Sequence, residues 1–148
     1  MLVAIQLRSW LTACDQAVLD HMNHEKSGGE MGKPLSNLPG TNLEQYFNQV
    51  VRLGTAEAIS IFEWIHRTKE AERTFLCLLD AVDGEVAEEQ LLSECGVLFC
   101  DGLNIHKQLA NAVGWKAPHF SKHSLQRMNE IADRARARRS GDRNAESD

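Results

Sequence analysis

The basic side chains of this 148-residue sequence gather in its last third, where they could bind anions. Residues 104–140 contain 8 Lys or Arg and 2 Asp or Glu, a net charge of +6, whereas residues 1–103 contain 7 and 16, a net charge of −9. Such an imbalance is typical of proteins with an anionic partner, but it also fits self-association or a solvated terminal helix. Residues 104–140 are therefore the first candidate for a binding surface.

Arginines dominate the end of this basic segment, at Arg134, Arg136, Arg138 and Arg139. Cations at the end of a helix interact favourably with the helix dipole, which is one account of their position. Alternatively, they bind phosphate groups or an acidic protein surface, and the acidic part of the same chain is one such surface. The sequence alone leaves these alternatives open.

Histidine pairs are the next side chains that could do chemistry, because imidazole binds metal ions. His119 and His123 are four residues apart and share a helical face. A zinc ion would need two more ligands, and His106 or Cys100 would have to fold back to supply them. Solvated or capping histidines are the simpler expectation, and no metal or cofactor is predicted.

The four cysteines form no Cys-x-x-Cys pair and lie inside otherwise helical, apolar patterns. A buried free thiol packs as a small hydrophobic group, which is the role predicted for Cys14, Cys77, Cys95 and Cys100. The sequence also contains no Gly-x-Ser-x-Gly or His-Glu-x-x-His motif and no pair of carboxylates with catalytic spacing. We therefore expect a protein without enzymatic activity.

No apolar run approaches the roughly 18 residues that a membrane span needs. The apolar N-terminus is too short for the hydrophobic region of a signal peptide and lacks a basic lead. We expect a cytoplasmic protein without membrane contact.

Helices are the elements expected to position these residues, because Ala, Leu, Glu, Gln and Arg are plentiful and the chain has only three prolines. The predicted fold is all-α, a compact bundle of about five or six helices whose last part is a basic helical hairpin. The first helix extends from Leu2 to about His24, with apolar residues at three- and four-residue steps. His21 and His24, near its end, are expected to be solvated capping side chains. A long loop from Ser27 to Gly40 follows, and its length predicts a mobile or functional segment.

A capping box formed by Thr41 and Glu44 predicts a short second helix. The buried face of this helix consists of Leu43, Phe47, Val50 and Val51. A third helix starts near Ala56, and its apolar stripe consists of Ala58, Ile59, Phe62 and Ile65. The polar residues 66–74 leave open whether this helix continues or two helices meet there.

Asp83 is the predicted N-cap of the next helix, whose first turn is rich in glutamate. This helix is expected to end at Asp101 and Gly102 and to bury Leu91, Leu92, Cys95, Leu98 and Phe99. The expected stop divides the chain into an acidic body of residues 1–102, a basic hairpin of residues 103–140 and a disordered tail of residues 141–148.

The hairpin begins with a helix that ends at Gly114, where a glycine can take the positive φ of a sharp turn. A tight turn follows, and Pro118 suits the first turn of a second helix, which carries Phe120, Leu125, Met128, Ile131 and Ala132. Through Gln108-Leu109-Ala110, Val113, Gly114 and Phe120-Ser121, this arrangement resembles the helix-turn-helix of phage-repressor-type regulators.

The resemblance implies that the second helix enters the major groove of DNA. Lys116, Ala117, His119 and Lys122 would then face bases or phosphates, and Lys107 would contact a backbone phosphate. Val113, Trp115 and Phe120 would fill the angle between the two helices. The sequence departs from the pattern at His123, at the bulky Trp115 and in the length of the second helix, and the same residues also fit an ordinary helical hairpin.

Two binding functions remain. One is a small, dimeric DNA-binding transcriptional regulator that contacts double-stranded DNA through residues 104–139. The alternative is a protein-binding adaptor, chaperone or inhibitor that contacts no nucleic acid. For either partner, the candidate contact residues are Lys107, Lys116, Ala117, His119, Lys122, Arg127, Arg134 and Arg138.

Overall fold

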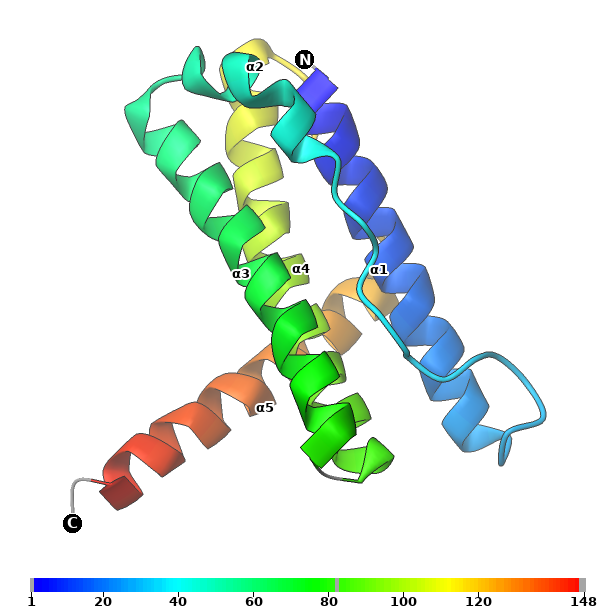
Figure 1. Cartoon of the computed structure of the whole chain (residues 1–148). Coiled ribbons are helices and arrows are strands. Elements are labelled where there is room, and N and C mark those ends of the chain that lie inside the picture. The colour runs from blue at the N-terminus through cyan, green and yellow to red at the C-terminus, as the bar shows by residue number, and fades with distance from the viewer. Residues whose placement is uncertain (1, 82, 147–148) are drawn as a thin grey trace.

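A computed structural model describes residues 2–81 and 83–146, apart from the side chain of Phe47. In this part of the chain five α-helices and one 3-10 turn occur without any strand, which confirms the all-α prediction. Helices α1, α3 and α4 lie side by side, whereas α5 crosses them and projects from the body at its C-terminal end (Figure 1). The elements are α1 (Leu2–Lys26), η1 (Leu43–Tyr46), α2 (Phe47–Val51), α3 (Thr55–Ala81), α4 (Gly84–Val113) and α5 (Lys122–Glu146).

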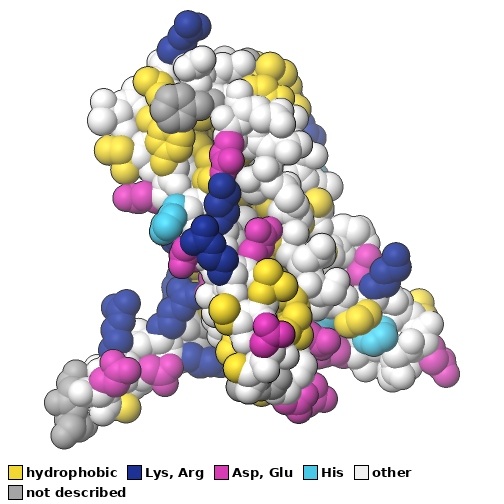
Figure 2. Space-filling model, viewed as in Figure 1, with side chains coloured by type: hydrophobic (Ala, Val, Ile, Leu, Met, Phe, Trp, Pro, Cys, Tyr) yellow, Lys and Arg dark blue, Asp and Glu magenta, His cyan; other side chains and the backbone are white. Residues whose placement is uncertain are grey.

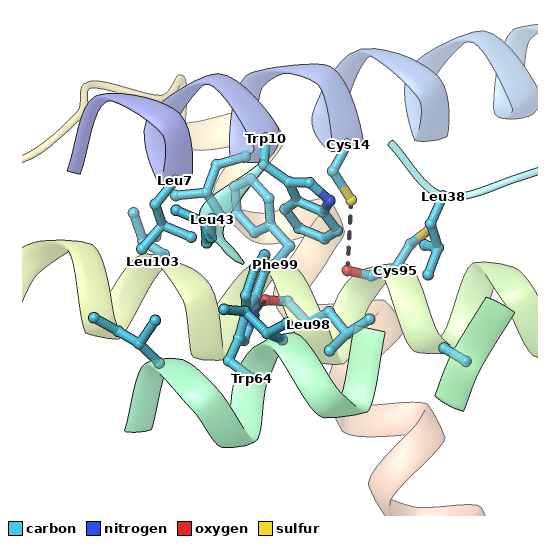
Figure 3. Close-up of a cluster of buried hydrophobic side chains, with 14 of the residues drawn as sticks. Leu7, Trp10, Cys14, Leu38, Leu43, Trp64, Cys95, Leu98, Phe99 and Leu103 are labelled. Carbon is cyan, nitrogen blue, oxygen red and sulfur yellow. Dashed lines mark hydrogen bonds between the residues drawn. The ribbon is translucent and has the colours of Figure 1, made fainter. Parts of the chain in front are cut away.

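Two tryptophans join α1, α3 and α4 in the core (Figure 3). The rings of Trp10 and Trp64 lie edge to face with their centroids 4.7 Å apart, an arrangement that aromatic pairs favour. The Trp64 Nε1–H donates to the carbonyl of Leu98 on α4 at 2.9 Å. The Trp10 Nε1–H donates to the carbonyl of Pro39, in the loop after α1, at 2.7 Å. These contacts fix three helices and a loop against one another.

The prediction that a helix ends at Asp101 and Gly102 is wrong, because α4 continues without interruption to Val113. A Cβ atom at Gly102 would lie 3.0 Å from Trp64 Nε1 and 3.2 Å from Leu11 Cδ2. Gly102 therefore makes room for the tryptophan ring and does not stop the helix. The predicted boundary between body and hairpin falls inside the central helix.

The third helix is a single element, which settles the alternative left open at residues 66–74. Its buried face is Ala58, Ile61, Trp64, Ile65, Thr68, Ala71 and Phe75. Ile59 was predicted to be buried but is 51% exposed, because the helix turns Ile61 and Trp64 toward α4 instead. Helix α4 begins as predicted, with the carboxylate of Asp83 accepting a hydrogen bond from the backbone N–H of Glu85 at 3.2 Å.

The loop after α1 packs against that helix through the buried side chains of Leu35 and Leu38. His21, expected to be solvated, is only 2% exposed. Its Nδ1 accepts a hydrogen bond from the backbone N–H of Leu35 at 3.0 Å, so His21 anchors the loop. The short helix near residue 47 buries Val50 but leaves Val51 exposed, contrary to prediction.

The start of the short helix near residue 47 and the C-terminus differ from the predictions. Glu44 forms an ion pair with Lys69 of α3, and η1 takes the place of the helix start that the capping box predicted. The side chain of Phe47 lies outside the described residues. Residues 141–146, predicted to belong to a disordered tail, continue α5, and residues 147–148 are not described.

Close packing of α5 on α4 at Gly96 predicts a clear mutational effect. A Cβ atom there would lie 2.5 Å from Ile131 Cγ2 and 3.0 Å from the backbone nitrogen of Ala132. Gly96→Ala should therefore lower the free energy of unfolding, measured in urea, by about 2 kcal/mol despite the better helix propensity of alanine. Gly141→Ala, which meets nothing within 4 Å, is the control and should cause no loss. Equal stability of both variants would contradict close packing at Gly96.

Candidate binding surface

Helix α4 ends at Gly114, whose φ of 72° is the left-handed conformation that glycine tolerates. The backbone N–H of Trp115 donates to the carbonyl of Ala110 at 2.8 Å and closes the helix. This C-terminus was predicted correctly. The predicted tight turn and the placement of Pro118 in a helix are wrong, because residues 115–121 form a seven-residue connection without helix and α5 begins only at Lys122.

The long connection follows from where Phe120 packs. Its ring lies edge-on against Phe99, with the centroids 5.0 Å apart. Phe99 precedes the end of α4 by about four helical turns, or roughly 22 Å, so the chain must run back along α4 before α5 can start. Ser121 then caps α5, because its Oγ accepts the backbone N–H of Ser124 at 3.1 Å.

Arg127, one of the predicted contact residues, is committed to an ion pair inside the protein. Its Nη2 lies 2.7 Å from Oδ1 of Asp15 on α1, and the two side chains are 15% and 18% exposed. The other carboxylate oxygen of Asp15 accepts a hydrogen bond from the Ser124 hydroxyl at 2.9 Å. Arg127 therefore holds α5 on α1 and is not presented to an outside partner.

The arginines at the end of the basic segment also face carboxylates of the body. Arg136 lies 3.4 Å from Asp101, which also pairs with Arg67 at 2.7 Å. Arg138 lies 3.9 Å from Glu89, and Arg139 pairs with Glu94. Of the alternatives that the sequence left open, these contacts support an acidic surface of the same chain as the partner of these arginines. Among them Arg134 differs, since its Nε bonds the backbone carbonyl of Glu130 at 3.3 Å within the same helix.

The remaining predicted contact residues belong to the first half of the basic segment, and their side chains are exposed. They are Lys107 on α4, Lys116, Ala117 and His119 in the connection, and Lys122 at the start of α5. No ion pair involves Lys107, Lys116 or Lys122 within the part of the chain that the structure describes. Residues 102–129 contain neither Asp nor Glu, so no carboxylate of this segment is available to pair with them.

Two large apolar side chains near Lys116 in the sequence are also exposed. Val113 and Trp115 were expected to fill an angle between helices, but they are 41% and 45% exposed. The expectation failed because α5 starts only at Lys122, beyond a seven-residue connection, so α5 does not pack against the end of α4 where Val113 and Trp115 lie. We refer to the exposed residues Val113, Trp115, Lys116, His119 and Lys122, which follow the connection from the end of α4 back toward its middle, as the connection surface.

Metal binding finds no geometric support in the basic segment. His119 and His123 are exposed, His106 is buried, and the thiol of Cys100 donates to the amide oxygen of Asn129 at 3.3 Å. Burial lowers the pKa of His106 despite a hydrogen bond to the backbone of Ala4, and burial raises the pKa of Cys100. Among the described residues, no group of three or more His, Cys, Asp or Glu side chains is placed to hold a metal ion.

The cysteines follow the prediction only in part. All four are free thiols, and Cys14 and Cys95 are buried, but Cys100 is half-buried and Cys77 is exposed. The thiol of Cys14 lies 3.8 Å from the carbonyl oxygen of Cys95. Hydrogen bonding to Cys95 and burial raise the pKa of Cys14, so this thiol stays protonated and acts as a packing group.

In comparisons with known proteins, no family model matches the chain, no curated protein matches its sequence, and no solved structure matches it. Within the described residues, no helix combines the length and the apolar character needed to cross a membrane.

The Arg127–Asp15 ion pair yields a stability prediction. Arg127→Met should lower the free energy of unfolding by about 2 kcal/mol, because the mostly buried carboxylate of Asp15 would lose its cationic partner. Arg73→Met removes an ion pair of similar length, 2.8 Å to Glu70, whose side chains are 72% and 50% exposed. This control should cost less than about 0.5 kcal/mol. Urea unfolding measures both, and equal losses would show that the buried pair does not hold α5.

Proposed function

We propose that this protein is a non-enzymatic binding module of the adaptor or inhibitor type, which docks an acidic protein partner on its connection surface. The observation that carries the proposal is Trp115, which is 45% exposed next to the unpaired Lys116. Tryptophan is among the residues that contribute most to protein–protein affinity, because its large ring is desolvated on contact. An exposed tryptophan in a cationic surrounding suits a partner with an apolar pocket and an acidic rim.

The charges of the connection surface favour an acidic partner. Lys116 and Lys122 of this surface, and Lys107 on α4, have no ion-pair partner in the described structure, so their charges are available to carboxylates of another molecule. Complementary charge of this kind speeds association and selects the partner. The arginines contribute less, because Arg127, Arg136, Arg138 and Arg139 already face carboxylates of the body.

Double-stranded DNA is the second candidate partner, and one observation favours it. The 28 residues from 102 to 129 lack acidic side chains, so phosphates could approach this stretch without repulsion. The resemblance to a helix-turn-helix motif supports DNA less, because the connection of residues 115–121 separates the two helices. Bound DNA would thus contact Lys116 and Lys122 along the connection, without a recognition helix inserted in the major groove.

Affinity capture from cells that produce the protein tests the proposal. Trp115→Ala and Lys116→Glu should each abolish retention of one stoichiometric protein partner, because each removes an element of the connection surface. Lys33→Glu, which makes the same charge change at an exposed residue of the loop after α1, should retain the partner. Retention that all three substitutions leave unchanged would contradict the proposal.

A duplex-binding assay with the same variants separates the two candidate partners. If the partner is DNA, the full chain binds mixed-sequence duplex and loses affinity steeply between about 50 and 200 mM salt. Lys116→Glu should then reduce the affinity and the salt dependence together. The proposal of a protein partner expects no measurable duplex binding.

A further inference from the structure

A hollow opens at the end of the molecule where α4 begins. Helices α1 and α4 diverge toward this end in Figure 1. Between them lies a cavity of about 600 Å³, lined by residues from the last turns of α1, the start of the following loop and the first turns of α4. Its carboxylates are Glu25, Glu85, Glu88 and Glu89, and its apolar side chains are Val86 and Leu92.

A smaller hollow with a mixed lining lies beside this cavity. The second space, of about 150 Å³, shares Glu25, Glu89 and Leu92 with the first and adds Met22, Ser93, Ile131, Arg134 and Arg138. The two hollows together form a groove with an acidic mouth and an apolar strip from α1, α4 and α5. This strip is bordered by Arg134 and by Arg138, which faces Glu89. A groove of this composition suits a ligand with an apolar face and positive charges beside it.

Exposed apolar side chains lie on the last turns of α3 and the first turn of α4. Leu76, Leu79 and Val86 are 62%, 45% and 51% exposed, and Val86 also lines the cavity. Figure 2 shows hydrophobic side chains gathered over the lower end of α3, with acidic side chains beside them. Large apolar side chains that are exposed together indicate an interaction surface more often than scattered ones do.

The charge of this end is strongly negative. Residues 70–94 contain 8 Asp or Glu and a single basic residue, Arg73. Glu70, Glu89 and Glu94 face arginines within the chain. Asp80, Glu85 and Glu88 have no ion-pair partner in the part of the chain that the structure describes, so their charges are available to a cationic ligand.

We propose that this groove docks a cationic amphipathic helix of a partner protein. Leucine-like side chains of that helix fill the strip formed by Met22, Leu92 and Ile131, and its lysines or arginines meet Glu85 and Glu88. A cavity of about 600 Å³ corresponds to roughly one to two turns of an α-helix about 10 Å wide. A helix lying across the hollow can thus insert its apolar side chains while its charged flanks stay in solvent.

The outer half of α5 from a second copy is a poorer occupant. Its residues 136–146 contain no apolar side chain larger than alanine, so they cannot fill the apolar strip. Arg136, Arg138 and Arg139 already face Asp101, Glu89 and Glu94 in their own chain. The charge and the apolar strip together therefore favour a different protein.

This groove lies at the start of α4, whereas Val113, Trp115 and Lys116 of the connection surface lie at its end; the 30 residues of α4 span about 45 Å. The groove proposal does not depend on the function proposed for the connection surface. If both proposals hold, the cationic helix of one partner binds at the start of α4 and the acidic surface of another partner binds at its end.

A fluorescent 16-residue helical peptide of leucine and lysine, with all leucines on one face, is the probe for the groove. Binding to the full-length chain should be saturable, and Glu88→Lys should weaken it at least about tenfold because it places like charges together. Glu63→Lys makes the same charge change on an exposed, unpaired residue of α3 outside the groove and should weaken binding less than about twofold. Val86→Ser should also weaken binding, since it removes apolar contact without changing charge.

Three results would overturn the proposal. Equal weakening by Glu88→Lys and Glu63→Lys would mean unspecific attraction to an acidic protein. A scrambled peptide of the same composition that binds as well as the amphipathic one would exclude recognition of an apolar face. A concentration-dependent dimer in sedimentation that Glu88→Lys dissociates would assign the groove to a second copy. Circular dichroism of each variant verifies that the helices are intact.

Discussion

The structure depends on the close approach of three other helices to α4, which two glycines permit. At Gly102 the indole of Trp64 and the side chain of Leu11 occupy the space that a Cβ atom would take. At Gly96 the chain of α5 comes equally close, at Ile131 and Ala132. Because interiors are packed as densely as organic crystals, such contacts fix the positions of whole helices. Helix α4 therefore serves as the axis on which α1, α3 and α5 are placed.

Placement of α5 determines what the basic segment can bind. Where α5 crosses the body, its arginines meet Asp15, Asp101, Glu89 and Glu94. The positive charges of α5 and the negative charges of the body are thus largely paired with each other within one chain. Among the described residues without an ion-pair partner are Lys107 and Lys116 toward the end of α4, and Asp80, Glu85 and Glu88 near its start. The two candidate binding surfaces therefore differ in charge, with the negative one at the start of α4 and the positive one toward its end.

Local signals in the sequence predicted much of the fold. The period of the apolar residues, the cap at Asp83 and the glycine at position 114 indicated helices that the structure contains. The failures involve tertiary contacts. A glycine that ends a helix and one that admits a tryptophan ring look alike in sequence, as Gly102 shows. The partnership of Asp15 with Arg127 spans 112 positions and has no local signature, so the loss of Arg127 as a free contact residue could not be predicted.

The central claim is that α4 passes unbroken through Gly102 and is held there by Trp64. Hydrogen exchange of the backbone amides of residues 100–106, followed by NMR, tests it most directly. Amides in a buried, continuous helix exchange only through unfolding of the whole domain, so these residues should belong to the slowest class. Exchange as rapid as in the non-helical connection of residues 115–121 would show a break at Gly102 and would contradict this account.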